Sequence, residues 1–354
     1  MCIKNPHTFL CVICKRKKIT MKLKEHIEPK GIYEIQIGES WKYHLDQGEH
    51  TKVHTYTEYE IWKTYNFKLS IREVSIAKVG QFSSWIEGLD SFEMDGKVFY
   101  RGKPDVDATH TTIAWFSQQK NQNIIFTITY TNERDEELDP LTDKDKYELI
   151  ERIIPTFNYI EESERESKLN SYRFRNFIRG VGASAYMLSE AVKNKAFIEA
   201  TCLLATQIDS LLRTAIVLQL QINNSNNEIE KEWIYQGLDD KKKSEKDIYK
   251  KAVELGILSE ELNTRLYELY NDRNRVIHRF VISEITLAEV EEIAYSYSIL
   301  SEEINSILYD IEAKQIELNV GITRTGNGDD ENPIDFIRGK IAKNGYFKDE
   351  EASR

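Results

Sequence analysis

The sequence predicts an α+β N-terminal domain, in which a helix closes an antiparallel sheet, followed by an all-α helical bundle. Two observations predict this order. Runs typical of strands are confined to Gly31–Tyr130, whereas the long helical patterns all follow Ile160. The chain has 354 residues, and at roughly 100–200 residues per domain this length favours two domains, each large enough for its own core.

We expect four segments along the chain. Residues 1–20 are a leader of unknown role, 21–160 the α+β domain for sensing or binding, 161–320 the helical domain and 321–354 a flexible tail. In the leader, apolar Phe9–Cys14 precedes basic Lys15–Lys18, which reverses the order of a secretory signal. We therefore expect no targeting segment.

The strand-like runs alternate apolar and polar residues or are rich in β-branched and aromatic side chains. Asp95-Gly96 reads as a hairpin turn between two of them, which favours antiparallel pairing. An acidic linker and a short amphipathic helix ended by Pro155 complete the domain. The runs are Ile32–Ile37, Val53–Trp62, Phe67–Ile76, Lys97–Arg101, Thr111–Phe116 and Ile124–Tyr130, the linker is Asn132–Pro140 and the helix is Asp143–Ile154.

This first domain resembles PsbP-like domains in three places: Trp41-Lys-Tyr, the paired strands Thr111–Phe116 and Ile124–Tyr130, and the closing segment Tyr147–Ile160. PsbP-like domains act mainly in binding or scaffolding, so the resemblance implies no catalytic residue in this part of the chain. A generic sheet-plus-helix domain is the alternative.

The second domain shows long amphipathic patterns with apolar residues at 3.6-residue spacing. A charged connector, Glu161–Lys168, leads into a helix over Arg173–Lys193 that we expect to be broken near Gly180–Gly182. The further expected helices are Ala196–Gln221, Ser244–Leu255, Ser259–Arg279 and Thr286–Leu318, the last of which opens with an N-cap and a glutamate at N3.

Composition limits the kinds of partner and compartment. The net charge is −11, and because neither main part is basic, loose coating of nucleic acid is disfavoured. The densest apolar stretch, Ile198–Leu220, is interrupted by charges, so no membrane span is expected. Four cysteines do not make a disulfide framework, and Cys11 and Cys14 lack a second ligand pair for a metal, so we expect a cytoplasmic protein without a metal.

One basic segment stands out in this acidic domain. Tyr270–Arg279 holds three arginines and one histidine, at the end of an expected helix. Asn274 and His278 lie four residues apart and so share a helical face, whereas Arg273 lies about 140° round from His278. The two can join at one site if the helix distorts, if the arginine wraps round, or if two copies meet. Dimerisation is the economical solution.

Arg273-Asn274-Arg275-Val276-Ile277-His278 resembles the Arg-x4-His signature of the HEPN family (higher eukaryotes and prokaryotes nucleotide-binding). The resemblance extends over roughly Arg173–Leu318, with an earlier long helix at Phe197–Arg213 and a glycine turn at Gly256. It implies metal-independent, cofactor-free RNA cleavage by a homodimer, of the kind used by toxin or antiviral defence effectors, some of which a regulatory partner protein restrains.

The residue types fit this chemistry. Histidine can take or return a proton near neutral pH, so His278 is the expected base for a ribose 2′-hydroxyl. Arg273 can grip two phosphate oxygens, and Asn274 can orient the histidine or the phosphate. We expect Arg275, Arg279 and Arg213 to contact RNA, and cleavage to leave a 2′,3′-cyclic phosphate.

Non-catalytic explanations stay open for the same residues. Cations at a helix C-terminus are stabilised by the macrodipole, by roughly 0.3–1 kcal/mol, without any catalysis. Asp272 can pair with Arg275 or Arg279, and Arg213 with Asp209 four residues before it. The rival function is a non-catalytic HEPN-like module that binds RNA or nucleotide and mediates dimerisation or partner binding. The absence of P-loop, Gly-x-Ser-x-Gly and His-Glu-x-x-His patterns disfavours other hydrolases.

Overall fold

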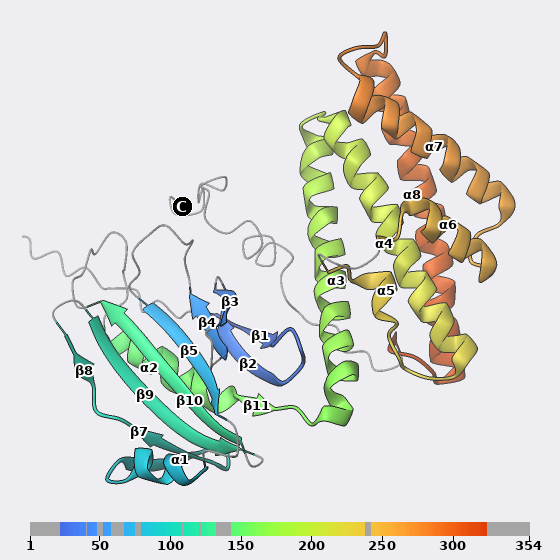
Figure 1. Cartoon of the computed structure of the whole chain (residues 1–354). Helices are drawn as coiled ribbons and strands as arrows, with labels where there is room; N and C mark the ends of the chain where they lie inside the picture. The colour runs from blue at the N-terminus through green and yellow to red at the C-terminus, as the bar shows by residue number, and fades with distance from the viewer. Residues whose placement is uncertain are drawn as a thin grey trace, which may run out of the picture. The chain divides into compact units, whose positions relative to one another are not determined.

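A computed structural model describes residues 22–39, 41–47, 52–57, 67–74, 79–107, 110–119, 122–131, 143–237 and 242–323. The expected leader, the acidic linker, Cys11, Cys14 and nearly all of the expected tail lie outside the described residues. Antiparallel strands in the N-terminal part precede a helical C-terminal part, which confirms the predicted fold class (Figure 1).

The chain divides into two compact units. The sheet unit comprises Met1–His26 and Glu34–Tyr159, and the helical unit comprises Ile27–Tyr33 and Ile160–Arg354. Ile27 joins the helical unit through its packing against Ile160 and Leu169.

The sheet unit contains two sheets. An eight-stranded sheet has the order β3-β4-β5-β10-β9-β7-β6, with β8 paired to β9, and a three-stranded sheet has the order β1-β2-β11. The strands are β1 Leu23–Ile27, β2 Tyr33–Gly38, β3 Lys42–Gln47, β4 Lys52–Thr57, β5 Phe67–Val74, β6 Asp90–Met94, β7 Lys97–Arg101, β8 Asp105–Val106, β9 His110–Gln119, β10 Gln122–Thr131 and β11 Asn158–Tyr159. The six predicted strands are among them, while β1, β3, β6, β8 and β11 had no predicted counterpart.

Alternation along β9 places its side chains on the two faces of the large sheet. Trp115 is buried and lies 5.6 Å, between ring centroids, from Tyr147 of helix α2 (Asp143–Ile153). Phe116 points the other way and contacts Phe82 of helix α1 (Val79–Ile86), which the sequence did not predict. A helix therefore packs on each face.

The predicted hairpin turn joins β6 to β7. Asp95 and Gly96 both have positive φ, 50° and 72°, as a two-residue hairpin loop requires. The next residue, Lys97, donates hydrogen bonds to the backbone carbonyls of Pro155 and Phe157, just after α2. The hairpin is thereby tied to the segment that closes the domain, and burial lowers the pKa of Lys97.

Two histidines pack among tyrosine rings in the sheet unit, where His54 is buried and His26 is partly buried. His26 of β1 packs against the rings of Tyr43 and Tyr56, and the Tyr43 hydroxyl lies 2.9 Å from Nδ1 of His54. Burial, with smaller contributions from the charges of Lys24 and His54, lowers the pKa of His26 from 6.5 to about 4. The folded state therefore holds His26 neutral.

Acid should destabilise the sheet unit through His26. Since its folded pKa is depressed, this stabilisation is complete above pH 6.5 and is lost as the pH falls toward 4, by about 3 kcal/mol in total. Urea unfolding followed by tryptophan fluorescence at pH 7.5 and 4.5 measures the loss. His26→Gln should flatten this part of the pH dependence, whereas a matched change at exposed His110 should not. Equal slopes for wild type and His26→Gln would contradict the assignment.

The helical unit consists of long helices whose ends largely match the prediction. They are α3 Glu162–Lys193, α4 Phe197–Asn224, α5 Lys231–Ile234, α6 Glu245–Glu254, α7 Glu260–Arg279 and α8 Leu287–Leu318 (Figure 1). Ser244, Ser259 and Thr286 cap the last three with side-chain hydrogen bonds, and the cap at Thr286 confirms the one that the sequence predicted. Helix α5 was not predicted.

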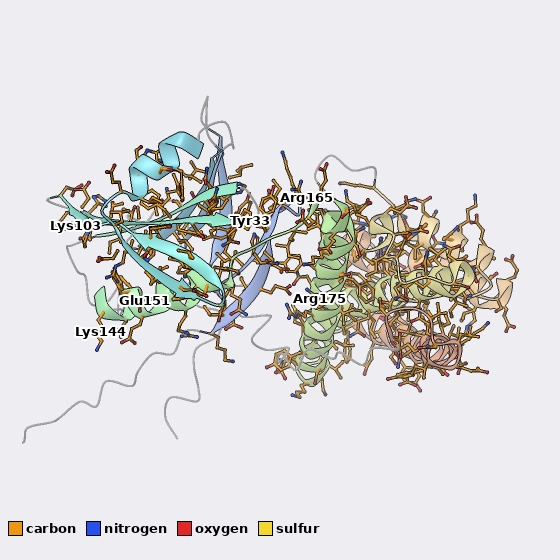
Figure 2. All side chains as sticks on the ribbon, turned by 90° about the horizontal axis from the view of Figure 1, so that it is seen from below. Tyr33, Lys103, Lys144, Glu151, Arg165 and Arg175 are labelled. Carbon is orange, nitrogen blue, oxygen red and sulfur yellow. The ribbon has the colours of Figure 1, made fainter. Side chains whose placement is uncertain are left out.

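The expected connector and break before α4 were wrong. Helix α3 begins at Glu162 and runs unbroken through Gly180 and Gly182 to Lys193, with Arg165 and Arg175 projecting from it (Figure 2). A glycine costs about 1 kcal/mol in a helix interior, which a helix of 32 residues packed along α4 can absorb.

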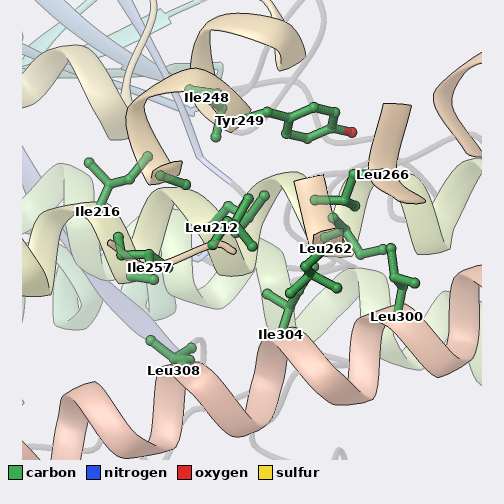
Figure 3. Close-up of a cluster of buried hydrophobic side chains, with 14 of the residues drawn as sticks. Leu212, Ile216, Ile248, Tyr249, Ile257, Leu262, Leu266, Leu300, Ile304 and Leu308 are labelled. Carbon is green, nitrogen blue, oxygen red and sulfur yellow. The ribbon is translucent and has the colours of Figure 1, made fainter. Parts of the chain in front are cut away.

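Helix α4 forms the centre of the hydrophobic core. Leu212 and Ile216 pack with side chains of α6, α7 and α8, among them Ile248, Leu266 and Ile304 (Figure 3). Among the described helices, α4 alone is long and apolar enough for a bilayer, and 61% of its most apolar window is buried, as in the core helix of a bundle. The expectation of no membrane span stays a prediction.

Candidate functional site

The end of helix α7 is oriented by a small hydrophobic cluster. Val276, inside the predicted motif, is buried and packs with Ile285 and Val290 of the turn and helix that follow. His278 lies two residues on, about 160° round the helix, and is exposed. Within the described residues, His278 makes no hydrogen bond or ion pair, so its imidazole is available to a ligand.

Arg273 points to the interior of the same unit instead. It lies about 60° from Val276 on the side of α7 that carries buried Leu269. Its side chain is 15% exposed, and Nη1 lies 2.5 Å from Oε1 of Glu245, the first residue of α6. Burial lowers the pKa of Arg273, but the hydrogen bond to Glu245 and the charge of Glu245, with smaller contributions from Tyr297 and Tyr249, together raise it above its ordinary value.

Asn274 and Arg275 bind neighbours within their own helix. The Asn274 side-chain oxygen accepts a hydrogen bond from Nη2 of Arg273 at 3.1 Å, so the amide orients the arginine. Arg275 pairs with Asp272 at 3.1 Å, the local pairing that the sequence left open. Arg279 is exposed beside His278, and no ion pair involves it within the described residues. The exposed cations of the motif are therefore Arg275 and Arg279.

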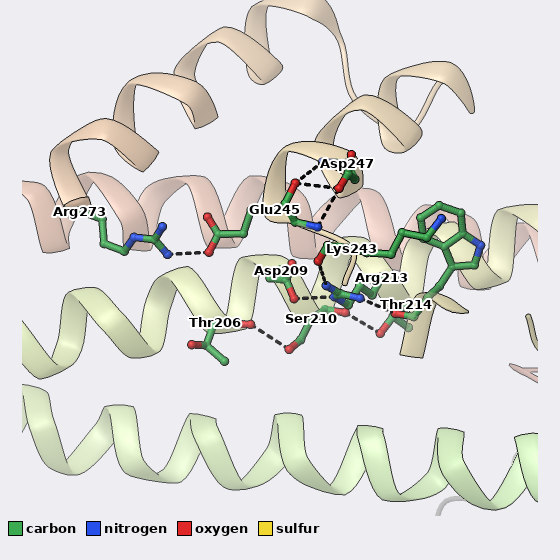
Figure 4. A network of polar contacts seen from close by, with 11 residues as sticks. Thr206, Asp209, Ser210, Arg213, Thr214, Lys243, Glu245, Asp247 and Arg273 are labelled. Atoms are coloured by element: carbon green, nitrogen blue, oxygen red, sulfur yellow. Dashed lines mark hydrogen bonds and ion pairs between the residues drawn. The ribbon is translucent and has the colours of Figure 1, made fainter. Parts of the chain in front are cut away.

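Arg213 lies elsewhere and is occupied by other groups. Its guanidinium donates to Asp209 at 2.6 Å and to the backbone carbonyls of Trp233 and Lys243 at 2.9 and 3.5 Å (Figure 4). With all three nitrogens engaged and 14% of the side chain exposed, Arg213 joins α4 to α5 and to the start of α6. Its predicted contact with RNA has no support in this geometry.

Several residues near Arg273 were not predicted from the sequence as members of the site. Tyr270 places its ring 4.9 Å from the guanidinium carbon, and Tyr297 of α8 donates a buried hydrogen bond to the carbonyl of Leu269. Burial raises the pKa values of Tyr297 and Tyr249 far above neutrality, and it also raises that of Cys202. None of these three groups ionises at neutral pH, so none is a ready base or nucleophile.

Glu245 was not predicted as a site residue either. The feature of the sequence that could have pointed to it is its position as a single acidic residue within the lysine-rich run Lys241–Lys246.

The site is thus split within one subunit. The base candidate His278 faces solvent, while Arg273 is held by Glu245 on the inward side of the same helix. The helix is regular through Arg279, so no helix distortion brings the two together, and the ion pair with Glu245 holds the Arg273 side chain away from His278. The third arrangement that the sequence allowed, the meeting of two copies, stays a prediction.

We also searched the described residues for side chains that could bind a metal ion together. Within the described ranges, no group of three or more His, Cys, Asp or Glu side chains lies close enough to hold a metal ion.

No family model and no curated protein matches the chain. Among solved structures, it is similar to the cyanobacterial PsbP (CyanoP) of Synechocystis sp. PCC 6803, at 12% identity and a TM-score of 0.25 over 40% of this chain and 94% of that one. It is also similar to a crystal structure from Bacteroides thetaiotaomicron, at 12% identity and a TM-score of 0.29 over 54% of this chain and 78% of that one. The first match falls on the N-terminal part, where the sequence resembles PsbP-like domains. None of these comparisons bears on the HEPN resemblance.

Proposed function

We propose that this chain is a metal-independent endoribonuclease of the HEPN type that acts as a homodimer, in the role of a toxin or antiviral defence effector in the cytoplasm. The observation that carries the proposal is His278: an exposed imidazole without a partner in the described part of the chain, fixed in direction by the burial of Val276.

The reaction needs a base and a cation beside one phosphodiester. His278 takes the proton from the ribose 2′-hydroxyl, whose oxygen attacks the adjacent phosphorus. The bond from phosphorus to the 5′-oxygen breaks, and that oxygen leaves as a hydroxyl with a proton returned from the imidazolium, directly or through water. The products are a 2′,3′-cyclic phosphate and a 5′-hydroxyl. Exposed Arg275 and Arg279 steer the RNA backbone, and Arg273 stabilises the negative charge on the phosphorane oxygens.

Association of two copies has support at the same end of the helical unit. Three apolar side chains next to His278 are exposed: Ile277 at 42%, Val281 at 92% and Ile282 at 82%. Covering them in a dimer removes apolar surface from water and brings two motifs together. In this proposal the second copy completes the site that one subunit leaves split.

A non-catalytic module that binds RNA or nucleotide is the second candidate. The ion pair between Arg273 and Glu245 favours it, because an arginine already neutralised inside its own subunit contributes less to a transition state. Exposed Arg275 and Arg279 then contact phosphate without any cleavage.

Incubation of the purified chain with single-stranded RNA in EDTA tests the proposal. We expect fragments that end in 2′,3′-cyclic phosphate, and we expect Arg273→Ala to slow cleavage by about 100-fold or more because a phosphate-stabilising cation is lost. The fragments are identified by mass spectrometry. Binding of the RNA by both proteins without any cyclic-phosphate product would favour the non-catalytic module. Toxicity on expression that disappears in Arg273→Ala would support the effector role.

A further inference from the structure

Two arginines of α7 bind carboxylates on other helices in different ways. Arg265 and Glu303 of α8 form a closed pair, in which two nitrogens meet two oxygens at 2.7 Å each. Arg273 meets one oxygen of Glu245 through one nitrogen only. Its Nε is buried and has no hydrogen-bond partner. A buried donor left unpaired costs about 1–3 kcal/mol, so this second pair is incompletely satisfied.

The other contacts of Arg273 orient it without neutralising it. Asn274 accepts from Nη2, and the ring of Tyr270 lies beside the guanidinium. Within the described residues, Glu245 is the carboxylate that forms an ion pair with Arg273. The guanidinium is therefore held in place by neutral groups and is charge-balanced by one group from another helix.

Glu245 can leave without unwinding α6. The cap of this helix is made by its neighbours, since Ser244 accepts from the backbone N–H of Asp247 and the Asp247 carboxylate accepts from Ser244. Arg213 holds the carbonyl of Lys243 one residue earlier (Figure 4). The side chain of Glu245 is 23% exposed, so water can take it up when it turns away.

We propose that Glu245 is an internal competitor of the RNA phosphate for Arg273, an inference that rests on the proposed function for the identity of the ligand. A phosphate offers several oxygens to a planar guanidinium and binds it through two parallel N–H groups. If two phosphate oxygens accept from Nη and Nε of Arg273, the Nε–H that has no partner in the pair with Glu245 gains one. In the free chain the carboxylate occupies the cation, and RNA binding displaces it.

Glu245→Gln tests this competition, because it removes the charge and keeps the shape. The probe is a single-stranded RNA 12-mer that carries 2′-O-methyl groups and so cannot be cleaved. By fluorescence anisotropy, Glu245→Gln should bind it about tenfold more tightly, the value of one charge-assisted hydrogen bond. The slope of log affinity against log salt should steepen by about 0.7, since one more phosphate is neutralised. Glu245→Asp, with a shorter reach, should shift both quantities the same way.

Glu303→Gln is the matched control, since it breaks an ion pair of the same helix away from the motif. It should leave the affinity for the 12-mer unchanged. Unchanged or weaker binding by both Glu245 variants overturns the competition, as does a failure of all the proteins to bind the probe. If Glu245→Gln binds the 12-mer more tightly and no variant cleaves natural RNA, the competition is supported and only the nuclease proposal is wrong. If cleavage depends on His278 and Glu245→Gln binds the 12-mer no more tightly than the wild type, the nuclease proposal is supported and the competition is wrong.

Discussion

His278→Ala should lower the rate of RNA cleavage by about 10²–10⁴-fold, the usual contribution of a positioned general base. The imidazole is exposed and makes no hydrogen bond or ion pair within the described residues, so its removal should leave the fold and the association of two copies intact. Cleavage is followed with a fluorescently labelled RNA in EDTA, and the oligomeric state by light scattering.

His110→Ala is the control for this variant, because His110 is an exposed histidine of the sheet unit, on strand β9. It should cleave like the wild type. If His278→Ala also keeps the full rate, His278 is not the base and the proposed mechanism is wrong. If the variant loses association together with activity, the histidine acts at the interface instead.

Leu266→Ala should lower the free energy of unfolding of the helical unit by about 4 kcal/mol. The side chain of Leu266 on α7 is fully buried in the core centred on α4 (Figure 3), and such truncations lose both transfer energy and packing around the cavity. Guanidinium unfolding followed by circular dichroism at 222 nm measures the loss, since the helices dominate that signal.

The comparison for this variant is Leu287→Ala. Leu287 is the first residue of α8 and is 62% exposed, so its truncation should change the stability by less than about 0.5 kcal/mol. Similar losses for the two variants would show that α7 is not packed as described.

Much of the helical unit was predictable because residues typical of helix ends stand in the sequence close to where the helices begin and end. The sequence placed helix starts at Ser259 and Thr286, which are the N-caps of α7 and α8 in the structure, and Gly256 takes the positive φ that its place in a turn requires. Helix α3 was misread because glycines and charges are local signals, whereas its packing along α4 is a tertiary effect. Short elements such as α1 offer too few residues for a periodicity to emerge.

The candidate site was predictable only in its local part. Helical spacing placed Asn274 and His278 on one face and separated Arg273 from His278, as the regular helix shows. It could not reveal that Glu245, 28 residues earlier, meets Arg273, since that contact depends on how α6 packs against α7. The pairing of Asp272 with Arg275 was one of two local options, and only the side-chain positions decide between them.

Because Val276 points into the core, the number of residues between it and Arg273 fixes the angle between these two side chains around α7. Each residue inserted between Arg273 and Val276 would rotate one of them by about 100° relative to the other, so the arginine would lose its contact with Glu245 or the valine would leave the core. An insertion between Val276 and His278 would leave Arg273 and Val276 in place, but it would turn both the imidazole and Phe280, which packs against the same cluster as Val276. The fold therefore constrains the length of this segment on both sides of the valine.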